Sequence, residues 1–156
     1  MENSQFRDLL GRFASGVTVI TTLDSAGRPH GMTVSAFCSV SLEPPLVLFC
    51  IDRAATMRDL FTIGQAYTIN VLAHDQRELS ERFSQLDMEL RFDGVRVSSP
   101  PNASPQLHGA AATLCCSVVS RFEGGDHDII VGRVLDGHTT SADPLVYHRG
   151  TYRRLD

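Results

Sequence analysis

Short apolar runs separated by turn signals constrain the fold of this chain more than any other feature of its sequence. The strand-like runs cover residues 16–22, 30–39, 46–51, 66–72, 111–122, 128–135, 144–148 and 151–155. Glu123-Gly124-Gly125-Asp126 and Arg149-Gly150 separate consecutive runs at hairpin spacing, and hairpins pair their strands antiparallel. Only two helix-sized segments separate successive runs, so a parallel α/β sheet fits poorly. We therefore predict a small, closed or nearly closed antiparallel β-barrel, mainly β with short helices.

The sequence predicts three short helices. The first begins at a cap formed by Asn3 or Ser4, and its i, i+3, i+4, i+7 spacing gives one apolar stripe of Phe6, Leu9, Leu10 and Phe13. The second covers residues 57–63 behind a Thr56 cap, and the third covers 75–83. Residues 90–94, followed by 98–102, are predicted to form an exposed excursion, too short to be a second domain.

Length and composition predict one domain covering residues 1–156. The hydrophobic share of 42% and the charged share of 21% are those of a soluble globular protein, and no apolar run is long enough to span a bilayer. The polar residues after Met1 do not resemble a signal peptide, so we expect a cytoplasmic location. The formal net charge of −4 argues against broad binding to nucleic acid or to an anionic membrane.

The cysteines and histidines lack the usual metal-binding spacings. All the cysteines lie in apolar runs without a CxxC, so we predict free structural thiols at Cys38, Cys50, Cys115 and Cys116. The six histidines form no H-x-H or H-E-x-x-H pattern, and we expect no metal site. The chain also has no G-x-G-x-x-G motif, P-loop or G-x-S-x-G elbow. A nucleotide would therefore have to be held in another way, and a hydrolase triad is not expected.

The stretch from Gly31 to Asp52 joins two strand-like runs through a double proline and is dense in hydroxyl groups. Its small hydroxyl residues are Thr33, Ser35, Ser39 and Ser41. Such a segment can bring N–H groups and hydroxyls to a flat or phosphorylated ligand, although strands rich in serine and threonine are also ordinary structure. The helix predicted after Thr56 would present unpaired N–H groups and a partial positive charge, which suits a phosphate.

His127 lies at the mouth of the predicted hairpin, directly after Gly124-Gly125-Asp126. A histidine in this place can orient a ligand or stabilise charge near neutral pH. It can equally be a solvated turn residue, and the spacing leaves both interpretations open.

Four segments, taken in order, resemble one known family. They are GVTVITT at 16–22, GMTVSAFCSVSLEPPL at 31–46, GDH at 125–127 and YHRGTY at 147–152. Together they resemble the flavin reductase-like domain of the small NAD(P)H:flavin oxidoreductases that serve two-component monooxygenases. The resemblance covers nearly the whole chain, and its most specific part is the TVSxFxSVSxxPP pattern. It implies a split β-barrel homodimer with flavin bound near the subunit interface.

The resemblance also implies the binding residues. For FMN or FAD they are Thr33, Val34, Ser35, Ala36, Ser39, Ser41, Cys50, Asp52, Arg82 and Phe83, with Ala55 and Thr56 at the phosphate. His127 would be the catalytic residue beside the nicotinamide of NADH or NADPH, in one region with Tyr147, His148, Arg149 and Gly150. Many relatives carry serine at the position of Ala36 and near Ala55, so backbone N–H groups would have to replace those hydroxyls here.

The implied reaction transfers a hydride from C4 of the nicotinamide to N5 of the flavin, which requires no nucleophile on the protein. The protein would hold the two rings at about 3–3.5 Å and stabilise the charge on the reduced flavin. We expect the reduced flavin to pass to a separate monooxygenase. Two alternatives stay open: a flavoprotein that keeps its FMN and acts on another small molecule, and a non-catalytic flavin- or haem-binding barrel module.

Overall fold

The structure is a computed structural model and describes residues 1–101 and 104–155. Its helical elements are α1 (Asn3–Gly11), η1 (Arg58–Leu60), α2 (Arg77–Gln85) and η2 (Met88–Leu90). Its strands are β1 (Ser15–Gly16), β2 (Thr18–Leu23), β3 (Pro29–Val34), β4 (Phe37–Leu42), β5 (Pro45–Asp52), β6 (Ala66–Val71), β7 (Val97–Ser98), β8 (Gln106–Leu107), β9 (Ala112–Gly124), β10 (His127–Thr139), β11 (Val146–His148) and β12 (Thr151–Arg153). Asn102, at the end of the predicted excursion, and Asp156, at the end of the predicted domain, lie outside the described residues.

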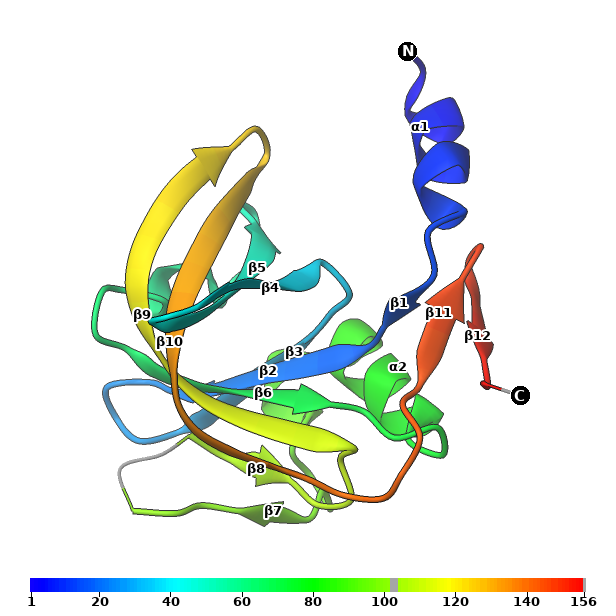
Figure 1. Cartoon of the computed structure of the whole chain (residues 1–156). Coiled ribbons are helices and arrows are strands. Elements are labelled where there is room, and N and C mark those ends of the chain that lie inside the picture. Colours follow the sequence, from blue (N-terminus) through cyan, green and yellow to red (C-terminus); the bar gives the residue numbers. More distant parts are fainter. Residues whose placement is uncertain (102–103, 156) are drawn as a thin grey trace.

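Antiparallel strands make up most of the molecule (Figure 1). The main sheet has seven strands in the order β3-β2-β6-β9-β10-β5-β4, and every strand pair in it is antiparallel. A small three-stranded sheet has the order β1-β11-β12, and β7 pairs with β8. The prediction of a mainly antiparallel β fold is confirmed.

The main sheet curls round because its two edge strands are neighbours in sequence. β3 and β4 lie at opposite edges of the sheet, yet only Ser35 and Ala36 separate them along the chain. Register shifts in β10 between Val131 and Gly132, and again beyond Val134, add local twist to the long hairpin. A Cβ at Gly132 would collide with the Tyr67 hydroxyl, so the close approach of this side chain requires glycine here. Among the described residues no ladder joins β3 to β4, so the predicted barrel is an open, strongly curled sheet.

Three local predictions were wrong. The strand predicted over 30–39 breaks at Ser35, where the chain leaves one edge of the sheet for the other. The helix predicted over 57–63 is only the single turn η1, because Gly64 N–H donates to Val118 O (2.9 Å) and draws the chain toward β9. α1 begins after Glu2 and has no side-chain cap, whereas Asn3 or Ser4 was expected to cap it.

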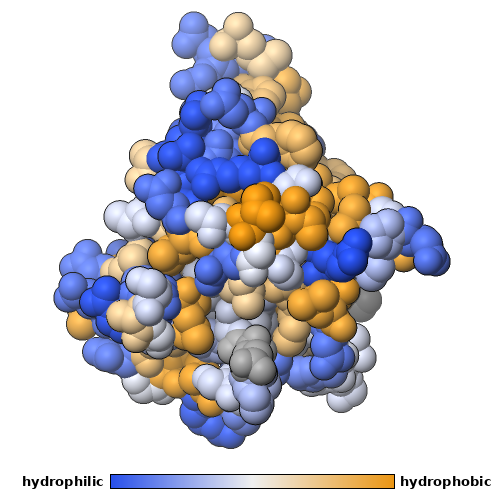
Figure 2. Space-filling view, turned by 90° about the vertical axis from the view of Figure 1, so that its left-hand side faces the viewer, coloured by the Kyte–Doolittle hydropathy of each residue, from blue (hydrophilic) through white to orange (hydrophobic). Residues whose placement is uncertain are grey.

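Hydrophobic side chains also lie exposed on the surface. Figure 2 shows a group of them in the middle of one face, bordered by hydrophilic residues. The exposed large residues of the sheet are Val40 and Leu42 on β4, Val119 and Phe122 on β9, and Leu135 on β10. Leu42, at the tip of the β4–β5 hairpin, is 94% exposed. Exposed hydrophobic residues on an edge strand and on other strands of the same sheet are typical of a surface that another protein covers.

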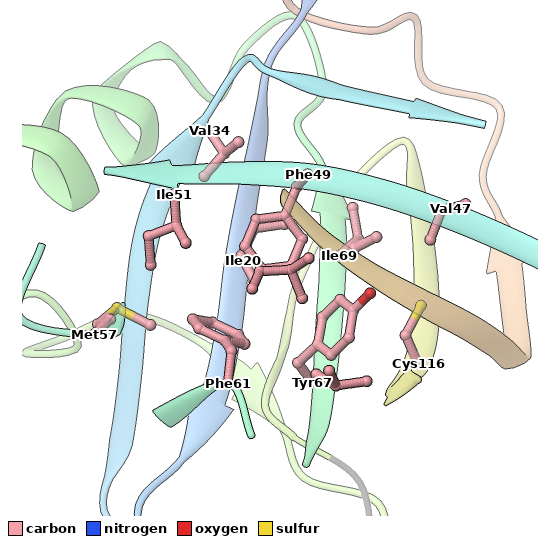
Figure 3. Packing of buried hydrophobic residues seen from close by; sticks show 12 residues of the cluster. Ile20, Val34, Val47, Phe49, Ile51, Met57, Phe61, Tyr67, Ile69 and Cys116 are labelled. Atoms are coloured by element: carbon pink, nitrogen blue, oxygen red, sulfur yellow. The ribbon is translucent and has the colours of Figure 1, made fainter. Parts of the chain in front are cut away.

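The core fills the inside of the curled sheet. Phe49 from β5 points toward Phe61 and Tyr67 in Figure 3, and the three rings meet edge-to-face with centroids 5.1–5.9 Å apart. All three residues are at most 1% exposed. A second cluster lies between β2 and α2, where the Phe83 ring packs on Gly31 and Phe92. β5 therefore has one face in a fully packed core, although a nearly continuous apolar run such as its residues 46–51 is typical of a strand covered on both faces.

The other face of β5 is only half-buried. Leu46, Leu48 and Cys50 alternate with the buried Val47, Phe49 and Ile51. Part of this half-buried face borders a cavity instead of a second layer of structure.

Candidate functional site

A cavity of about 940 Å³ lies between the main sheet and the two ends of the chain. One side, which we call the sheet wall, consists of Ser35, Ala36, Phe37, Cys38, Leu48 and Cys50. The opposite side, the outer wall, consists of residues from α1 to β1 and from the β11–β12 turn: Asn3, Phe6, Arg7, Leu10, Gly11, Phe13, Ser15, Tyr147, Arg149 and Gly150. Asp126 and His127, at the tip of the β9–β10 hairpin, complete the lining. Segments from both ends and the middle of the chain therefore face one space.

The sheet wall offers backbone hydrogen-bond donors between the end of β3 and the start of β4. The N–H groups of Ser35 and Ala36 have no hydrogen-bond acceptor in the part of the chain described by the structure, and both residues are exposed to the cavity. Ala36 O accepts from Cys50 N–H (3.0 Å), which fixes this corner against β5. Burial, followed by the influence of Cys38, raises the pKa of the Cys50 thiol, so Cys50 is a neutral, half-buried part of the wall.

His127 stands at one end of the cavity and is held by its neighbour. Its Nδ1 lies 2.7 Å from Asp126 Oδ1. A carboxylate only accepts hydrogen bonds, so Nδ1 carries a proton and Nε2 is left for a ligand. The hydrogen bond from His127 lowers the pKa of Asp126 below its usual value. The solvated-turn interpretation of His127 is therefore incomplete, since the side chain is oriented and lines the cavity.

The loop after β5 lies beside His127, because Asp52 and His127 are partners in the β5–β10 ladder. The loop turns back at Ala54 and Ala55, whose N–H groups donate to Asp52. The N–H groups of Thr56 and Met57 have no acceptor within the described part of the chain. We expected a helix N-terminus to bind a phosphate here, but η1 is only a single turn. The unpaired N–H groups of Thr56 and Met57 can still bind a phosphate.

A buried carboxylate ties this loop to the hairpin. Asp128, with its side chain 2% exposed, accepts from Arg58 Nε at 2.6 Å and from Arg121 Nη2 at 2.5 Å. Arg53 Nε lies 3.7 Å from the same carboxylate and Arg53 Nη2 lies 3.0 Å from Glu123. Hydrogen bonding from Arg58 is the main reason that the pKa of Asp128 lies below its usual value. The network fixes the position of the loop relative to His127.

The structure brings together about half of the residues predicted for the site. Those that line the cavity are Ser35, Ala36, Cys50, His127, Tyr147, Arg149 and Gly150. Asp52, Ala55 and Thr56 lie in the adjoining loop.

The remaining predicted residues have other surroundings. Val34 is buried in the core, and the Thr33 hydroxyl donates to Ser80 O (2.7 Å). Ser39, Ser41 and His148 lie on strands but do not line the cavity. Phe83 is fully buried and so has no surface to offer a ligand.

Arg82 belongs to a different cavity. It donates to Leu90 O and Asp93 O, and it lines a hollow of about 690 Å³ beside α2. Direct contact of Arg82 and Phe83 with a ligand in the larger cavity has no support from this geometry.

Sequence reasoning missed most of the outer wall. The stripe of α1 was recognised as apolar, but it gave no sign that Phe6, Leu10 and Phe13 would border a cavity. Cys38 was expected to be a structural thiol in a strand, and instead it is exposed on the sheet wall. Among the described residues no group of three or more His, Cys, Asp or Glu side chains could hold a metal ion.

Comparison with known proteins gives one consistent result. Residues 10–156 match the family model described as the flavin reductase like domain. An NADH-dependent flavin reductase of a Rhodococcus species is 41% identical over 155 residues, covering 96% of this chain and 85% of that protein. HsaB, the reductase subunit of a flavin-dependent monooxygenase of Rhodococcus jostii, is 37% identical over 97% of this chain and 77% of its own length.

A solved structure agrees with the sequence comparisons. The NADH:FAD oxidoreductase SgcE6 of Streptomyces globisporus, in complex with NAD and FAD fragments, superposes with a TM-score of 0.91 at 33% identity, covering 99% of this chain and 93% of that one. The sheet topology, the cavity and these matches lead to the same assignment: the chain belongs to the flavin reductase like domain family.

Proposed function

We propose that this protein is a flavin reductase, which oxidises NADH or NADPH, reduces FMN or FAD, and supplies the reduced flavin to a separate monooxygenase. The observation that carries the proposal is the cavity of about 940 Å³, in which backbone donors, an oriented histidine and a cationic outer wall face one space. The relatives are themselves named NADH-dependent flavin reductase and monooxygenase reductase subunit.

The flavin supplies the redox chemistry by accepting a hydride from the nicotinamide. The protein's own residues would bind and orient. The free N–H groups of Ser35 and Ala36 are suited to the polar edge of a flat ring system, and the donors of Thr56 and Met57 to its phosphate. His127 Nε2 would contact the nicotinamide from the hairpin tip. None of these roles needs a nucleophile or a proton-abstracting base.

We also propose that the protein is a homodimer. The exposed hydrophobic residues of β4, β9 and β10 support this proposal, because an edge strand with such residues is suited to a second copy. Light scattering would measure the oligomeric state. No helix among the described residues is long and apolar enough to cross a membrane. The cytoplasmic location remains a prediction.

The test of the function is to mix the purified protein with NADH and an excess of FMN, FAD or riboflavin and to follow the loss of reduced nicotinamide. We expect oxidation of NADH that depends on added flavin. Protein that oxidises neither NADH nor NADPH with any of the three flavins would contradict the proposal. Yellow colour that survives gel filtration would instead indicate a flavoprotein that retains its FMN.

A further inference from the structure

Two arginines of the outer wall face the cavity without a partner. Arg7 on α1 and Arg149 in the β11–β12 turn both line the cavity, and neither has an ion pair or a hydrogen-bond acceptor for its guanidinium among the described residues. Arg12, also near α1, pairs with Asp8 at 3.7 Å. In a chain with a net charge of −4, two free guanidinium groups beside one cavity indicate an anionic ligand.

The backbone brings these two arginines to the same place. Arg149 N–H donates to Gly11 O at 3.0 Å, which attaches the β11–β12 turn to the end of α1. Arg7 lies four residues before Gly11, about one helical turn away on the same face of the helix. A Cβ at Gly11 would stand 3.6 Å from Arg149 Cα, so the two elements are in close contact here.

The backbone conformation of Arg149 indicates that the turn itself does not favour an arginine at this position. Among the described residues it alone, apart from glycines, has a positive φ, of 52°, and Gly150 follows with a φ of 76°. A two-residue hairpin turn with positive φ at both positions favours Asn-Gly or Asp-Gly. Backbone strain of this kind persists where a side chain has another role. Facing the cavity gives Arg149 such a role.

We infer that Arg7 and Arg149 bind the pyrophosphate of the reduced nicotinamide dinucleotide. The inference rests on the proposed function, because that function brings two phosphorylated ligands to the cavity. The donors at Thr56 and Met57 are proposed for the flavin phosphate and lie in the loop beside His127, outside the lining of the cavity. Guanidinium groups pair with phosphate oxygens through two parallel hydrogen bonds, which suits a pyrophosphate. NADH and NADPH share this group, so the pair does not select between them.

The test compares three variants of the hairpin by steady-state kinetics and thermal unfolding. Arg149→Asn removes the cation and restores the residue that the turn prefers, whereas Arg149→Lys keeps a cation. Arg153→Asn is the matched control, because Arg153 lies on the same hairpin, is exposed and lines no described cavity. We expect Arg149→Asn to raise the KM for NADH about tenfold, with kcat and the flavin KM changed less than about twofold.

The same variant should become more stable as it loses affinity. We expect its Tm to rise by about 2–4 °C, since the turn is relieved. Arg149→Lys should keep the KM for NADH within about threefold, and Arg153→Asn should leave it unchanged. A variant with a damaged fold would have a lower Tm and a lower kcat. A higher Tm together with a weaker affinity for NADH therefore distinguishes ligand binding from a structural role.

A substrate without phosphate completes the experiment. Dihydronicotinamide riboside has the reactive ring but no pyrophosphate, so wild type and Arg149→Asn should oxidise it with equal kcat/KM. An unchanged KM for NADH in Arg149→Asn, or an equal loss with NADH and the riboside, would overturn the inference. A wild-type protein that oxidises neither substrate would overturn the proposed function itself, which is a distinguishable result.

Discussion

The two walls of the cavity differ in how firmly they are held. Behind the sheet wall lies a packed core, with Phe49 and Ile51 fully buried on the opposite face of β5. The α1 part of the outer wall has no such support, because α1 buries none of its residues and Phe13 is 80% exposed. This part is attached by a few backbone hydrogen bonds, among them Arg149 N–H to Gly11 O at 3.0 Å and the short β1–β11 pairing. The β11–β12 hairpin itself is fixed to α2, where the Tyr152 hydroxyl lies 2.8 Å from Ser80 Oγ.

This difference matches the two ligands of the proposed reaction. A rigid wall keeps its donors in place before a flavin arrives, which lowers the cost of binding. A loosely attached wall opens locally at little cost in free energy, so a second substrate can enter and its product can leave. We therefore assign the flavin to the sheet wall and the nicotinamide dinucleotide to the outer wall.

The largest difference between the two walls should appear in how much a substitution lowers the free energy of unfolding. Replacing Phe49 by alanine leaves a cavity among Phe61 and Tyr67, so we expect a loss of about 3–5 kcal/mol in the free energy of unfolding. Leu10→Ala on α1, where Leu10 is 58% exposed, should cost less than about 0.5 kcal/mol. Urea unfolding measures both. Similar losses in the two variants would mean that a packed partner surface covers α1 in solution.

Replacing His127 should change the kinetics with NADH and leave the stability of the fold unchanged. His127→Ala removes the group that we assign to nicotinamide orientation, and we expect kcat/KM for NADH to fall about 10- to 100-fold. Because the side chain is 42% exposed and packs against little, Tm should stay within about 1 °C of wild type. His138→Ala is a suitable control, since that exposed histidine on the same hairpin does not line the cavity. Unchanged KM and turnover in His127→Ala would remove it from the site.

The Asp128 network predicts how stability depends on pH. Its pKa in the folded protein lies below the unfolded value of about 3.9, so the ionised group stabilises the fold above about pH 4. That contribution is lost as the pH falls from about 4 toward the lowered pKa. We expect Asp128→Asn to be less stable than wild type at neutral pH and the difference to shrink below pH 4. A difference that is constant from pH 7 to pH 3, measured by urea unfolding, would contradict this account.

The smallest effect should come from one hydroxyl on the sheet wall. Ala36→Ser adds a donor beside the free N–H groups of Ser35 and Ala36, and we expect it to tighten flavin binding about 2- to 10-fold. Ser39→Ala, on an exposed position outside the cavity lining, should not change flavin affinity. Flavin fluorescence titration measures both. Weaker binding in Ala36→Ser would mean that the ring needs the space that alanine leaves.

Local signals predicted most of the strands. Gly124-Gly125 and Arg149-Gly150 mark the hairpins that pair β9 with β10 and β11 with β12. The break at Ser35 could not be predicted, because the alternating pattern continues through it and only the curl of the whole sheet separates β3 from β4. The exposure of α1 could not be predicted either, because periodicity identifies the apolar face of a helix but not what covers that face.

The site was predicted through the family pattern and not through periodicity. Ser35, Ala36 and His127 were found in this way, and they do line one cavity. Phe83 is buried because β3 passes close to α2 at Gly31, a contact of the tertiary fold that no local pattern encodes. Arg7 was missed because it lies between the apolar stripe positions of α1, and that stripe gave no sign of a cavity.

The most direct test of the two-wall assignment measures two quantities on two variants. The dissociation constant for FMN and the KM for NADH would be determined for Ala36→Ser on the sheet wall and Arg149→Asn on the outer wall. We predict that Ala36→Ser changes only the FMN constant and Arg149→Asn changes only the NADH KM. If both quantities moved together in either variant, the two walls would not bind separate ligands, and the assignment would be contradicted.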